Sequence, residues 1–448
     1  MYSYSGRLNA RHFIDLPIMK KVLVITYYWP PASGPGVQRW VKFSKYLRDF
    51  GWDPVILTIA NGSYPSSDES LANDLPEDLQ VFKTRTIEPF ALYAKLMGQK
   101  DNKLPIGYAG EENKGIIGKI AQKIRANLFI PDARIGWTPF AYAKAAKIIT
   151  EQEIDTIITT GPPHSTHLIG RKLKRLGNLK WIADFRDPWT NIYYNKQLPK
   201  SKRSIIKDHK LETSVIKECD QLITVTPGLV SEFKNRKKGI NLIFNGYDPE
   251  DFEGIQQVTD SKFSLSYIGN LKASQNCKVF WEVLSDLIKT NQEFKEDFEL
   301  RLIGNTNPAI KKELLELNLD SNIKFEEFVP HHVAIQKMKN SQMLFFIVPE
   351  VENNDILLTG KIFEYLASTT PLFSVGPKGG NAAKIISECK HQEMIDYADK
   401  NELKSAVLAN YLHWKENNNA LPKHKGNVHL KYSRKGLTEQ LSKVLHCK

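Results

Sequence analysis

The chain is long, mixed in composition and basic. It has 448 residues, of which 41% are hydrophobic and 25% are charged. This composition excludes an intrinsically disordered chain, and the length predicts two or three domains. The net charge of +12 suits a nucleic acid, an anionic lipid surface or a phosphorylated small molecule as partner, and it equally suits solubility alone.

The cysteines and the N-terminal segment bear on cellular location. The four cysteines form no CxxC pair, which predicts a reduced, cytosolic chain without a disulfide framework or zinc site. Residues 1–18 lack the apolar region of a signal peptide, so we expect Met19 to be the natural start and 1–18 a disordered extension. No run of 18 apolar residues is present, so we expect no membrane-spanning helix.

From Lys20 onward, short β-branched runs alternate with helical patterns. In the first half of the chain the predicted strands are 22–27, 54–59, 79–84, 154–159, 179–185, 221–225 and 241–244. The predicted helices between them are 37–47, 139–150, 165–176 and 202–217. Such alternation is typical of a parallel, doubly wound sheet.

A second alternating series follows a polar, turn-rich stretch that is typical of an interdomain linker. Its predicted strands are 263–268, 298–303, 323–325, 343–348 and 372–375, and its predicted helices are 278–289, 308–317, 332–339 and 361–367. The sequence therefore predicts an α/β protein with two Rossmann-like, doubly wound domains facing a cleft. The expected parts are a domain at 19–246, a linker at 247–262, a domain at 263–430 and a C-terminal helix at 431–448 that crosses back onto the first domain.

The segment 101–132 interrupts the first domain. Within it, 115–130 combines isoleucines and lysines at helical spacing and predicts a basic amphipathic helix. The pattern fits an ordinary surface helix packed on the core, and it also fits a helix that contacts a membrane surface.

The stretch VITYYWPPASGPGVQRW places a proline- and glycine-rich loop between the first predicted strand and helix. In an open parallel sheet, ligands bind beyond the carboxyl ends of the strands. At Gly34 and Gly36 the backbone amides can approach a phosphate near a helix N-terminus. The loop has neither GxGxxG nor the P-loop GK[ST], so it does not indicate a nicotinamide cofactor, and a purely structural turn would show the same pattern.

Two more strand ends of the first domain carry polar side chains. In TTGPPHSTHLIG, we expect His164 rather than His167 to face the cleft, where it would donate to an oxyanion or a sugar hydroxyl. A helix cap with an incidental histidine is the alternative. In WIADFRDPWT, the side chains of Asp184, Arg186 and Asp187 crowd one strand end, as either a structural ion-pair network or a binding cluster.

In the second domain, SYIGNLKASQN places Asn270 and Lys272 just after a strand, where the lysine is well placed to meet a phosphate. The most specific motif is LTGKIFEYLA, which contains Lys361 and Glu364 on one helix face. The start of this helix and Lys361 would hold a diphosphate, and Glu364 would accept from two ribose hydroxyls. A capped core helix with a surface Lys–Glu pair is the alternative.

Together these stretches resemble glycosyltransferases of the GT-B architecture, close to glycosyltransferase family 4. The resemblance covers 20–445 and is carried, in this order, by YYWPPASGPGVQR, GPPHSTHLIG, DFRDPW, FNGYDPEDF, YIGNLK, GKIFEYLA and YSRKGLTEQLSKVL. It implies transfer of a sugar from a nucleotide-sugar donor with retained anomeric configuration. The donor would lie mostly on the second domain, and a glycan or lipid-linked acceptor on the first.

The resemblance also implies roles for the matching residues. Near the donor diphosphate and sugar it places Gly34, Gly36, His164, Asn270, Lys272 and Lys361. Beside the base it places Val329 and Pro330 of FVPHH, and on the ribose it places Glu364. The binding set also includes Thr359 and Gly360, because they open the helix whose start would hold the diphosphate. The acidic and basic residues taken as catalytic, together with His164, are Asp184, Arg186 and Asp187.

The chain departs from the family pattern at two positions. At Asn270 the family usually has an arginine, and at Ile356 it often has the first of two glutamates. The second departure leaves open which sugar is moved. Because the Asp-rich metal motifs of the other glycosyltransferase fold are missing, we expect neither a metal nor another cofactor, with Lys361 and helix dipoles stabilising the leaving diphosphate.

Three alternatives stay open at this stage. They are a sugar-nucleotide 2-epimerase on the same fold, a non-catalytic nucleotide-sugar-binding scaffold motivated by Ile356, and a nucleic-acid-binding protein motivated by the charge. The third is disfavoured because no nucleic-acid-binding motif is present. We favour a cytoplasmic enzyme of cell-surface polysaccharide synthesis, with peripheral membrane contact through 115–130 if the acceptor is lipid-linked.

Overall fold

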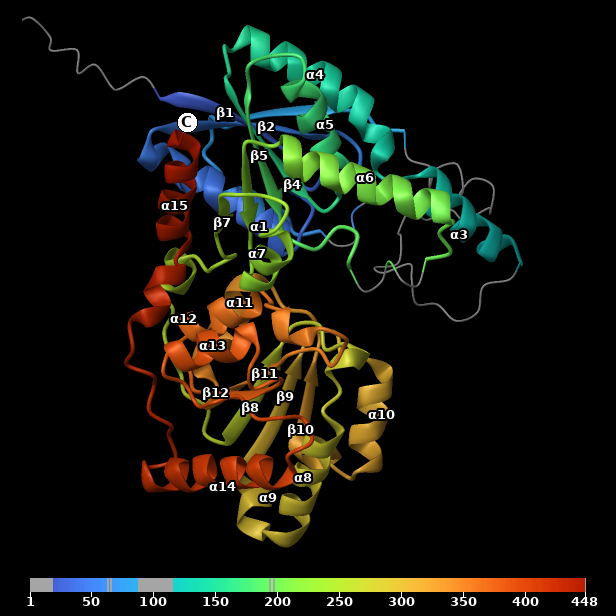
Figure 1. The fold of residues 1–448 in the computed structure, drawn as a ribbon. Helices are drawn as coiled ribbons and strands as arrows, with labels where there is room; N and C mark the ends of the chain where they lie inside the picture. Colours follow the sequence, from blue (N-terminus) through green and yellow to red (C-terminus); the bar gives the residue numbers. More distant parts are fainter. Residues whose placement is uncertain are drawn as a thin grey trace, which may run out of the picture.

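The computed structural model describes residues 19–62, 64, 67–87, 116–192, 195 and 198–447, without the side chains of 116–121 and 428. The expected extension at 1–18 and the residues 88–115 lie outside the described residues. Figure 1 shows two α/β domains, one above the other, with the N-terminal half of the chain in the upper domain.

The structure contains two parallel sheets. The first has the strand order β3-β2-β1-β4-β5-β6-β7 and the second has the order β10-β9-β8-β11-β12. The strands of the first sheet are β1 (Lys20–Ile25), β2 (Trp52–Ile59), β3 (Gln80–Thr84), β4 (Thr156–Gly161), β5 (Lys180–Phe185), β6 (Gln221–Thr224) and β7 (Ile240–Leu242). Those of the second are β8 (Phe263–Ile268), β9 (Phe298–Ile303), β10 (Ile323–Glu326), β11 (Met343–Ile347) and β12 (Leu372–Val375). The predicted fold class is confirmed, and each predicted strand is present with bounds shifted by at most two residues.

Helices cover both faces of the first sheet, which explains why its strands are nearly continuous apolar runs. The chain-order helices of this part are α1 (Pro35–Tyr46), α3 (Ile116–Leu128), α4 (Thr138–Glu151), α5 (Ser165–Lys174), α6 (Lys202–Glu218) and α7 (Pro227–Phe233). One hydrophobic cluster joins the sheet to α4, α5, α6 and α7, and a second joins its other face to α1.

The second sheet is covered in the same way. Its helices are α8 (Lys278–Thr290), α9 (Gln292–Asp297), α10 (Pro308–Glu316), α11 (His331–Asn340), α12 (Lys361–Ala367), α13 (Asn381–Glu388) and α14 (Lys400–Glu416). One face packs on α8, α9, α10 and α14, and the other on α11, α12 and α13.

The last helix, α15 (Arg434–His446), returns to the first sheet. It runs beside the upper domain in Figure 1, and its Leu437 and Leu441 are completely buried in the hydrophobic cluster that contains α1. The segment expected to be a linker is also fixed in place. The Asp248 carboxylate is fully buried, and it accepts hydrogen bonds from Lys45 and Tyr46 of α1 and forms an ion pair with Lys42.

Four helices, α7, α9, α13 and α14, are not among those predicted from the sequence. Of these, α14 is the longest, and it buries a single stripe formed by Leu403, Val407, Tyr411 and Trp414. Its remaining positions mix polar residues with exposed Leu412, which obscures the stripe. Among the helices that the structure describes, none has both the length and the apolar character needed to cross a membrane.

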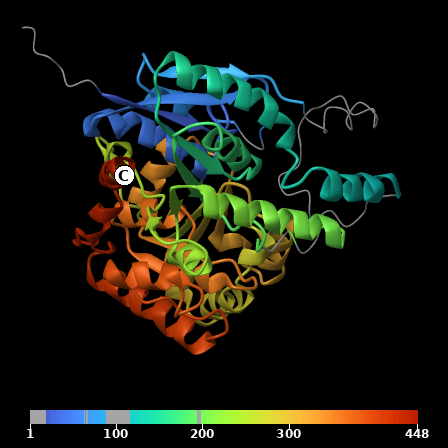
Figure 2. The same ribbon diagram turned by 45° about the horizontal axis from the view of Figure 1, so that its top comes forward.

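The predicted basic amphipathic helix is present as α3. It projects from one side of the first domain beside the end of α6 (Figures 1 and 2). Asn127 fixes it there, since its side chain bonds the carbonyl of Pro199, the amide of Ser201 and the hydroxyl of Ser204. The exposed fractions of Ile124 and Leu128 are 48% and 69%, so part of the apolar face of α3 is open to solvent.

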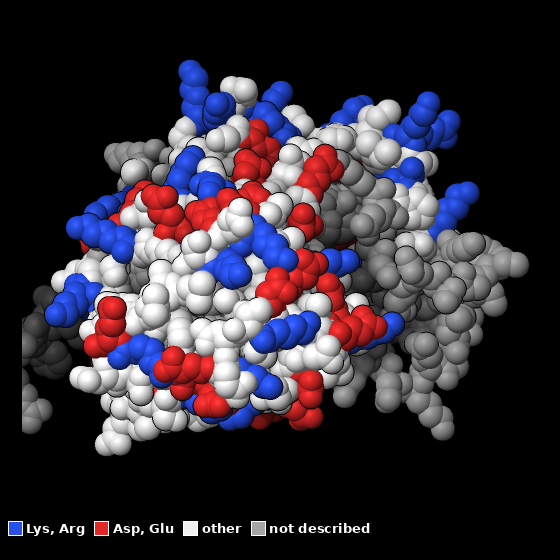
Figure 3. Space-filling view, turned by 90° about the horizontal axis from the view of Figure 1, so that it is seen from below, with Lys and Arg blue, Asp and Glu red and all other residues white. Residues whose placement is uncertain are grey.

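The positive net charge is not gathered on the face that Figure 3 shows. Figure 3 views the molecule from below, where basic and acidic side chains are interspersed. This face therefore lacks the concentrated basic patch that a nucleic-acid-binding surface requires.

Candidate active site

Most of the sequence-predicted residues follow the carboxyl ends of strands, and some of them lie at the points where strand order reverses. In the first sheet the reversal lies between β1 and β4, and in the second between β8 and β11. The opening loop follows β1, and Gly269 follows β8. Ligands of doubly wound sheets bind at this position because the loops there diverge and leave a crevice.

The opening loop faces the start of α12 in the other domain. A Cβ built on Gly360 would lie 3.8 Å from Cβ of Pro35. Next to Pro35, the backbone at Gly34 has φ of +122°, and none of the residues that the structure describes has an atom within 4 Å of the position of a Cβ there. Gly34 caps α1, with its carbonyl accepting from the amides of Val37 and Gln38. The loop thus presents an unobstructed backbone at the junction of the two domains.

In contrast, Gly36 faces a side chain of its own domain. A Cβ at Gly36 would lie 1.3 Å from Nη1 of Arg186. The Arg186 guanidinium donates to Oγ1 of Thr160 at 3.1 Å and to the carbonyl of Pro162 at 2.6 Å, and burial lowers its pKa. The glycine therefore makes room for Arg186 between the loop after β1 and the loop after β4.

Asp184 lies in the interior of the first domain. Its fully buried carboxylate accepts hydrogen bonds from Arg39, Trp40 and Thr160 at 2.9–3.3 Å. The structural alternative raised for this cluster thus describes Asp184, which orients Arg39 of α1. Asp187, two residues after the end of β5, is half-buried, and burial raises its pKa.

His164 sits at the start of α5 with 7% of its surface exposed, whereas His167 is fully buried. The ring of His164 stacks on Trp189 at 5.0 Å. Burial lowers the pKa of His164 well below 6.5, so its imidazole is neutral at neutral pH. Asp132 fixes the adjacent residue, since its carboxylate accepts from the amide and hydroxyl of Ser165.

In the second domain, Lys361 reaches from α12 to the end of β8. A Cβ on Gly269, whose φ is +121°, would lie 2.6 Å from Nζ of Lys361. The ammonium donates to the hydroxyl of Tyr267 at 2.8 Å and lies 4.1 Å from the centroid of its ring. Burial lowers the pKa of Lys361 to about 7, an effect that Glu364 opposes and Lys272 reinforces. Gly269 is therefore required for the approach of Lys361 to the strand end.

The other predicted residues of this domain differ in exposure. Asn270 and Lys272 are exposed after β8, and Thr359 is half-buried before α12. Val329 is half-buried and Pro330 exposed at the start of α11.

Glu364 has a partner that the sequence analysis missed. Its Oε1 lies 3.0 Å from Nε2 of His331, the first residue of α11. Burial opposes the charged form of His331, but Glu364 outweighs it and raises the pKa of His331 above 6.5. The FVPHH stretch contained this residue, and its position after Pro330 was the available signal.

Ile356 also has a structural role. A Cβ on Gly228, at the start of α7, would lie 2.4 Å from Cβ of Ile356. The position where the family often has a glutamate thus forms an apolar contact between the two domains, which a carboxylate could not replace without losing its hydration.

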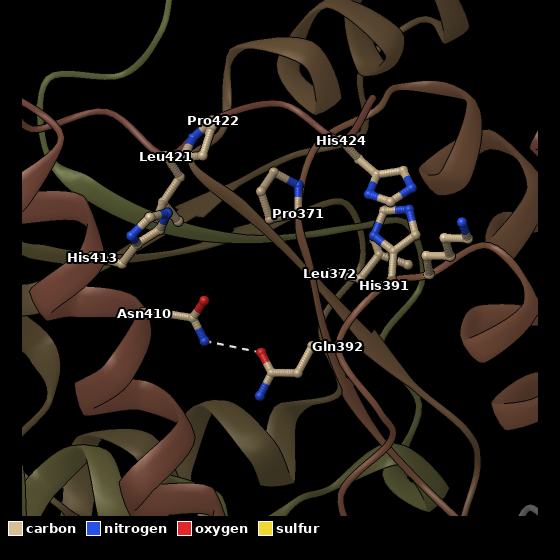
Figure 4. Close-up of a pocket in the computed structure, with 10 residues that line it drawn as sticks. Pro371, Leu372, His391, Gln392, Asn410, His413, Leu421, Pro422 and His424 are labelled. Carbon is tan, nitrogen blue, oxygen red and sulfur yellow. Dashed lines mark hydrogen bonds between the residues drawn. The ribbon is translucent and has the colours of Figure 1, made fainter. Parts of the chain in front are cut away.

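A pocket of about 200 Å³ lies in the second domain away from these residues (Figure 4). Pro371 and Leu372 place it at the amino end of β12, opposite the edge that carries the predicted residues. The imidazoles of His391 and His424 stack on one side of it, 4.2 Å apart. This pocket is separate from the candidate site.

Comparisons with known proteins agree on the fold. No protein-family model and no curated protein matches the chain. Among solved structures, sucrose-phosphate synthase from Thermosynechococcus elongatus superposes with a TM-score of 0.62 at 12% identity, over 95% of this chain and 98% of that one. A TarM variant from S. aureus, in complex with fondaparinux, α-GlcNAc-glycerol and UDP, gives 0.58 at 12% identity over 96% and 100%.

A putative UDP-N-acetylglucosamine 2-epimerase from Listeria monocytogenes gives a TM-score of 0.52 at 10% identity over 94% of both chains. Identities this low establish the fold alone. The two sheets, their strand orders and the full-length superpositions show that the chain has the GT-B architecture expected from the resemblance.

Proposed function

We propose that the chain is a glycosyltransferase that moves a sugar from a nucleotide-sugar donor to a glycan or lipid-linked acceptor in cell-surface polysaccharide synthesis. One observation carries this proposal. The Lys361 ammonium lies against Gly269 at the end of β8, and the same helix start meets the opening loop of the other domain at Pro35. The solved TarM complex, which contains UDP and a glycan, supports a donor and acceptor of this general kind.

The chemistry follows from where charge develops. When the bond between the sugar and the diphosphate breaks, negative charge grows on the diphosphate oxygens. Lys361, the exposed Lys272 and the free backbone at Gly34 would stabilise that charge. A bound diphosphate also favours the ammonium form of Lys361, so it reverses the effect of burial on this group.

The first domain would supply the groups near the sugar and the acceptor. A neutral His164 can donate one hydrogen bond to a sugar hydroxyl. Asp187 is half-buried with a raised pKa, so it retains a proton to a higher pH than an exposed aspartate. Arg186 and Asp184 act through position, because both are engaged in hydrogen bonds within the domain. Retention of configuration is an expectation carried over from the family resemblance.

The reaction is proposed to need no metal. One acidic group in the part of the chain that the structure describes has the geometry to bind an ion, formed by Asp74, Asp248 and Asp251. The Lys42 ammonium lies 2.7–3.0 Å from all three carboxylates, so an internal cation already balances them. Turnover should therefore be unchanged after treatment with EDTA, and loss of turnover restored by a divalent ion would refute this part of the proposal.

The test of the proposed function is release of nucleoside diphosphate from a panel of nucleotide sugars, with and without acceptor glycans. We expect release that depends on an acceptor. Lys361→Met should reduce it by roughly a hundredfold or more. Lys384→Met, on the exposed side of α13, is the matched control and should leave it unchanged.

A sugar-nucleotide 2-epimerase is the second candidate, because the structure of the putative 2-epimerase from Listeria superposes over 94% of its length. An epimerase converts the donor in the absence of any acceptor, whereas the proposed transferase does not. Binding of nucleotide without any turnover would instead indicate a non-catalytic scaffold. The observation that supports this alternative is the contact of Ile356 with Gly228.

The exposed apolar side chains of α3 support an acceptor at a membrane surface. Ile124 and Leu128 are open to solvent on a helix that also exposes Lys123, which is the composition of a helix lying in a lipid interface. We expect the protein to sediment with vesicles containing phosphatidylglycerol. The double variant Ile124→Ser, Leu128→Ser should lose this binding, and retention of binding would exclude α3 as the contact.

A further inference from the structure

A small cavity lies at the junction of the two domains beside Glu364. Its volume is about 20 Å³, which is room for one water molecule or one hydroxyl group. The walls come from α1, from Leu71 and Asp74, from the segment between the domains, from α11 and α12, and from Arg434 at the start of α15. Parts of the sequence that lie far apart thus meet at one polar cavity.

Backbone contacts fix Arg434 at this cavity. The amide of Tyr247 donates to the carbonyl of Tyr432 at 3.1 Å, and the amide of Arg434 donates to the carbonyl of Tyr247 at 2.7 Å. A Cβ on Gly246, whose φ is +65°, would lie 2.3 Å from the carbonyl oxygen of Tyr432. The glycine of FNGYDPEDF therefore allows the C-terminal segment to approach the junction.

The Arg434 side chain is buried, and one of its hydrogen-bond donors has no partner among the described residues. Only 4% of the residue is exposed, and Nη1 has no hydrogen-bond partner among the described residues. Burial lowers the pKa of this guanidinium to about 9, an effect that Arg39 reinforces and Glu364 opposes. A buried donor of a charged group that lacks a partner is costly, so this donor points to a ligand atom or a trapped water.

The carboxylates around the cavity differ in their availability. Asp248 and Asp251 are ion-paired with Lys42. Among the described residues, Glu364 forms no ion pair with Arg434, and only its Oε1 is engaged, by His331. An acceptor on Glu364 and a donor on Arg434 therefore face one cavity without contacting each other.

We propose that Arg434 and Glu364 together hold a sugar hydroxyl of the nucleoside, with the hydroxyl donating to the Glu364 carboxylate and its oxygen accepting from Nη1 of Arg434. A hydroxyl is both donor and acceptor, so it satisfies both groups at once. The inference rests on the proposed function, and it extends the ribose contact assigned to Glu364 by adding a residue from the C-terminal helix.

The experiment is calorimetric titration of the full chain with nucleoside diphosphates and with their 2′-deoxy and 3′-deoxy forms. The wild type should bind the ribonucleotide about tenfold or more tightly than one of the deoxy forms, because the missing hydroxyl leaves charged groups unpaired. Arg434→Gln should weaken binding of the ribonucleotide by a similar factor and leave binding of that deoxy form unchanged. The control is Lys435→Gln, which removes a neighbouring exposed charge that pairs with Asp49.

Each outcome has a distinct meaning. Equal affinity of the wild type for the ribonucleotide and both deoxy forms overturns the inference without any variant, and this holds even if Arg434→Gln does not fold. Undiminished discrimination in a folded Arg434→Gln variant overturns it as well, and means that the cavity holds only a structural water. If the wild type binds no nucleotide at all, the proposed function fails together with the inference.

Discussion

Arg186 occupies the space that a side chain at position 36 would need. A Cβ on Gly36 would lie 1.3 Å from Nη1 of Arg186, and the same guanidinium is bonded to Thr160 and Pro162. The loops that follow β1, β4 and β5 are thereby joined into one unit. This unit forms the side of the site that the first domain contributes.

Gly36→Ala should disrupt this unit. The added methyl group must displace Arg186, so we expect transfer activity to fall by roughly tenfold or more, measured as kcat/KM with saturating acceptor. Gly177→Ala is the matched control, because a Cβ at that position would meet no atom of the described part of the chain within 4 Å. Normal activity of Gly36→Ala would show that the position of Arg186 is not critical.

The fold could be predicted well from the sequence because buried parallel strands are short apolar runs with few alternatives. β8 and β9 have the predicted bounds, and so does α12. The helix α14 was missed because its buried stripe of Leu403, Val407, Tyr411 and Trp414 is narrow and lies among other apolar residues. Short helices such as α7 give too few turns for a periodic pattern.

The site was predictable only in its local parts. Lys361 and Glu364 were visible as a motif on one helix face, but the approach of Lys361 to Gly269 and Tyr267 was not. His331 meets Glu364 through tertiary packing, and Arg434 arrives from the far end of the chain. Contacts of this kind depend on how the two domains and α15 dock, which no local pattern specifies.

The pKa of Lys361, which burial lowers to about 7, predicts a pH dependence of binding. Above pH 7 the free protein must take up a proton to bind a diphosphate, so affinity should fall by up to about tenfold per pH unit between pH 7.5 and 9. Calorimetry in buffers of different ionisation enthalpy measures this proton uptake. In Lys361→Met we expect weaker binding and no such slope, and an unchanged slope would assign it to another group.

The His331–Glu364 contact predicts a pH dependence of stability. The folded pKa of His331 is raised above its ordinary value of 6.5, so its contribution is fully present below pH 6.5. The contribution is lost as the pH rises through the folded pKa. In urea unfolding, the free energy of unfolding of the wild type should therefore exceed that of His331→Gln by an amount that shrinks as the pH rises. A difference that stays constant with pH would contradict the assignment.

We predict that Asp184 is needed for the stability of the folded protein. Replacing it with asparagine leaves Arg39 as a buried, uncompensated charge, which should cost about 3 kcal/mol or more in the free energy of unfolding. Denaturant titration measures this loss. Removal of the exposed Arg175–Glu218 pair by Arg175→Gln is the control and should have little effect. A stable, inactive Asp184→Asn protein would instead support direct involvement in the reaction.

The central claim is that Lys361 and the opening loop hold the diphosphate of a nucleotide sugar between the two domains. Thermal unfolding of the wild type and of Lys361→Met with a panel of nucleoside diphosphates tests it most directly, because a ligand that binds only the folded state raises the Tm. We predict that at least one nucleoside diphosphate raises the Tm of the wild type and of Lys384→Met, but not that of Lys361→Met. An equal rise in Lys361→Met, or no rise in any protein, would contradict the claim.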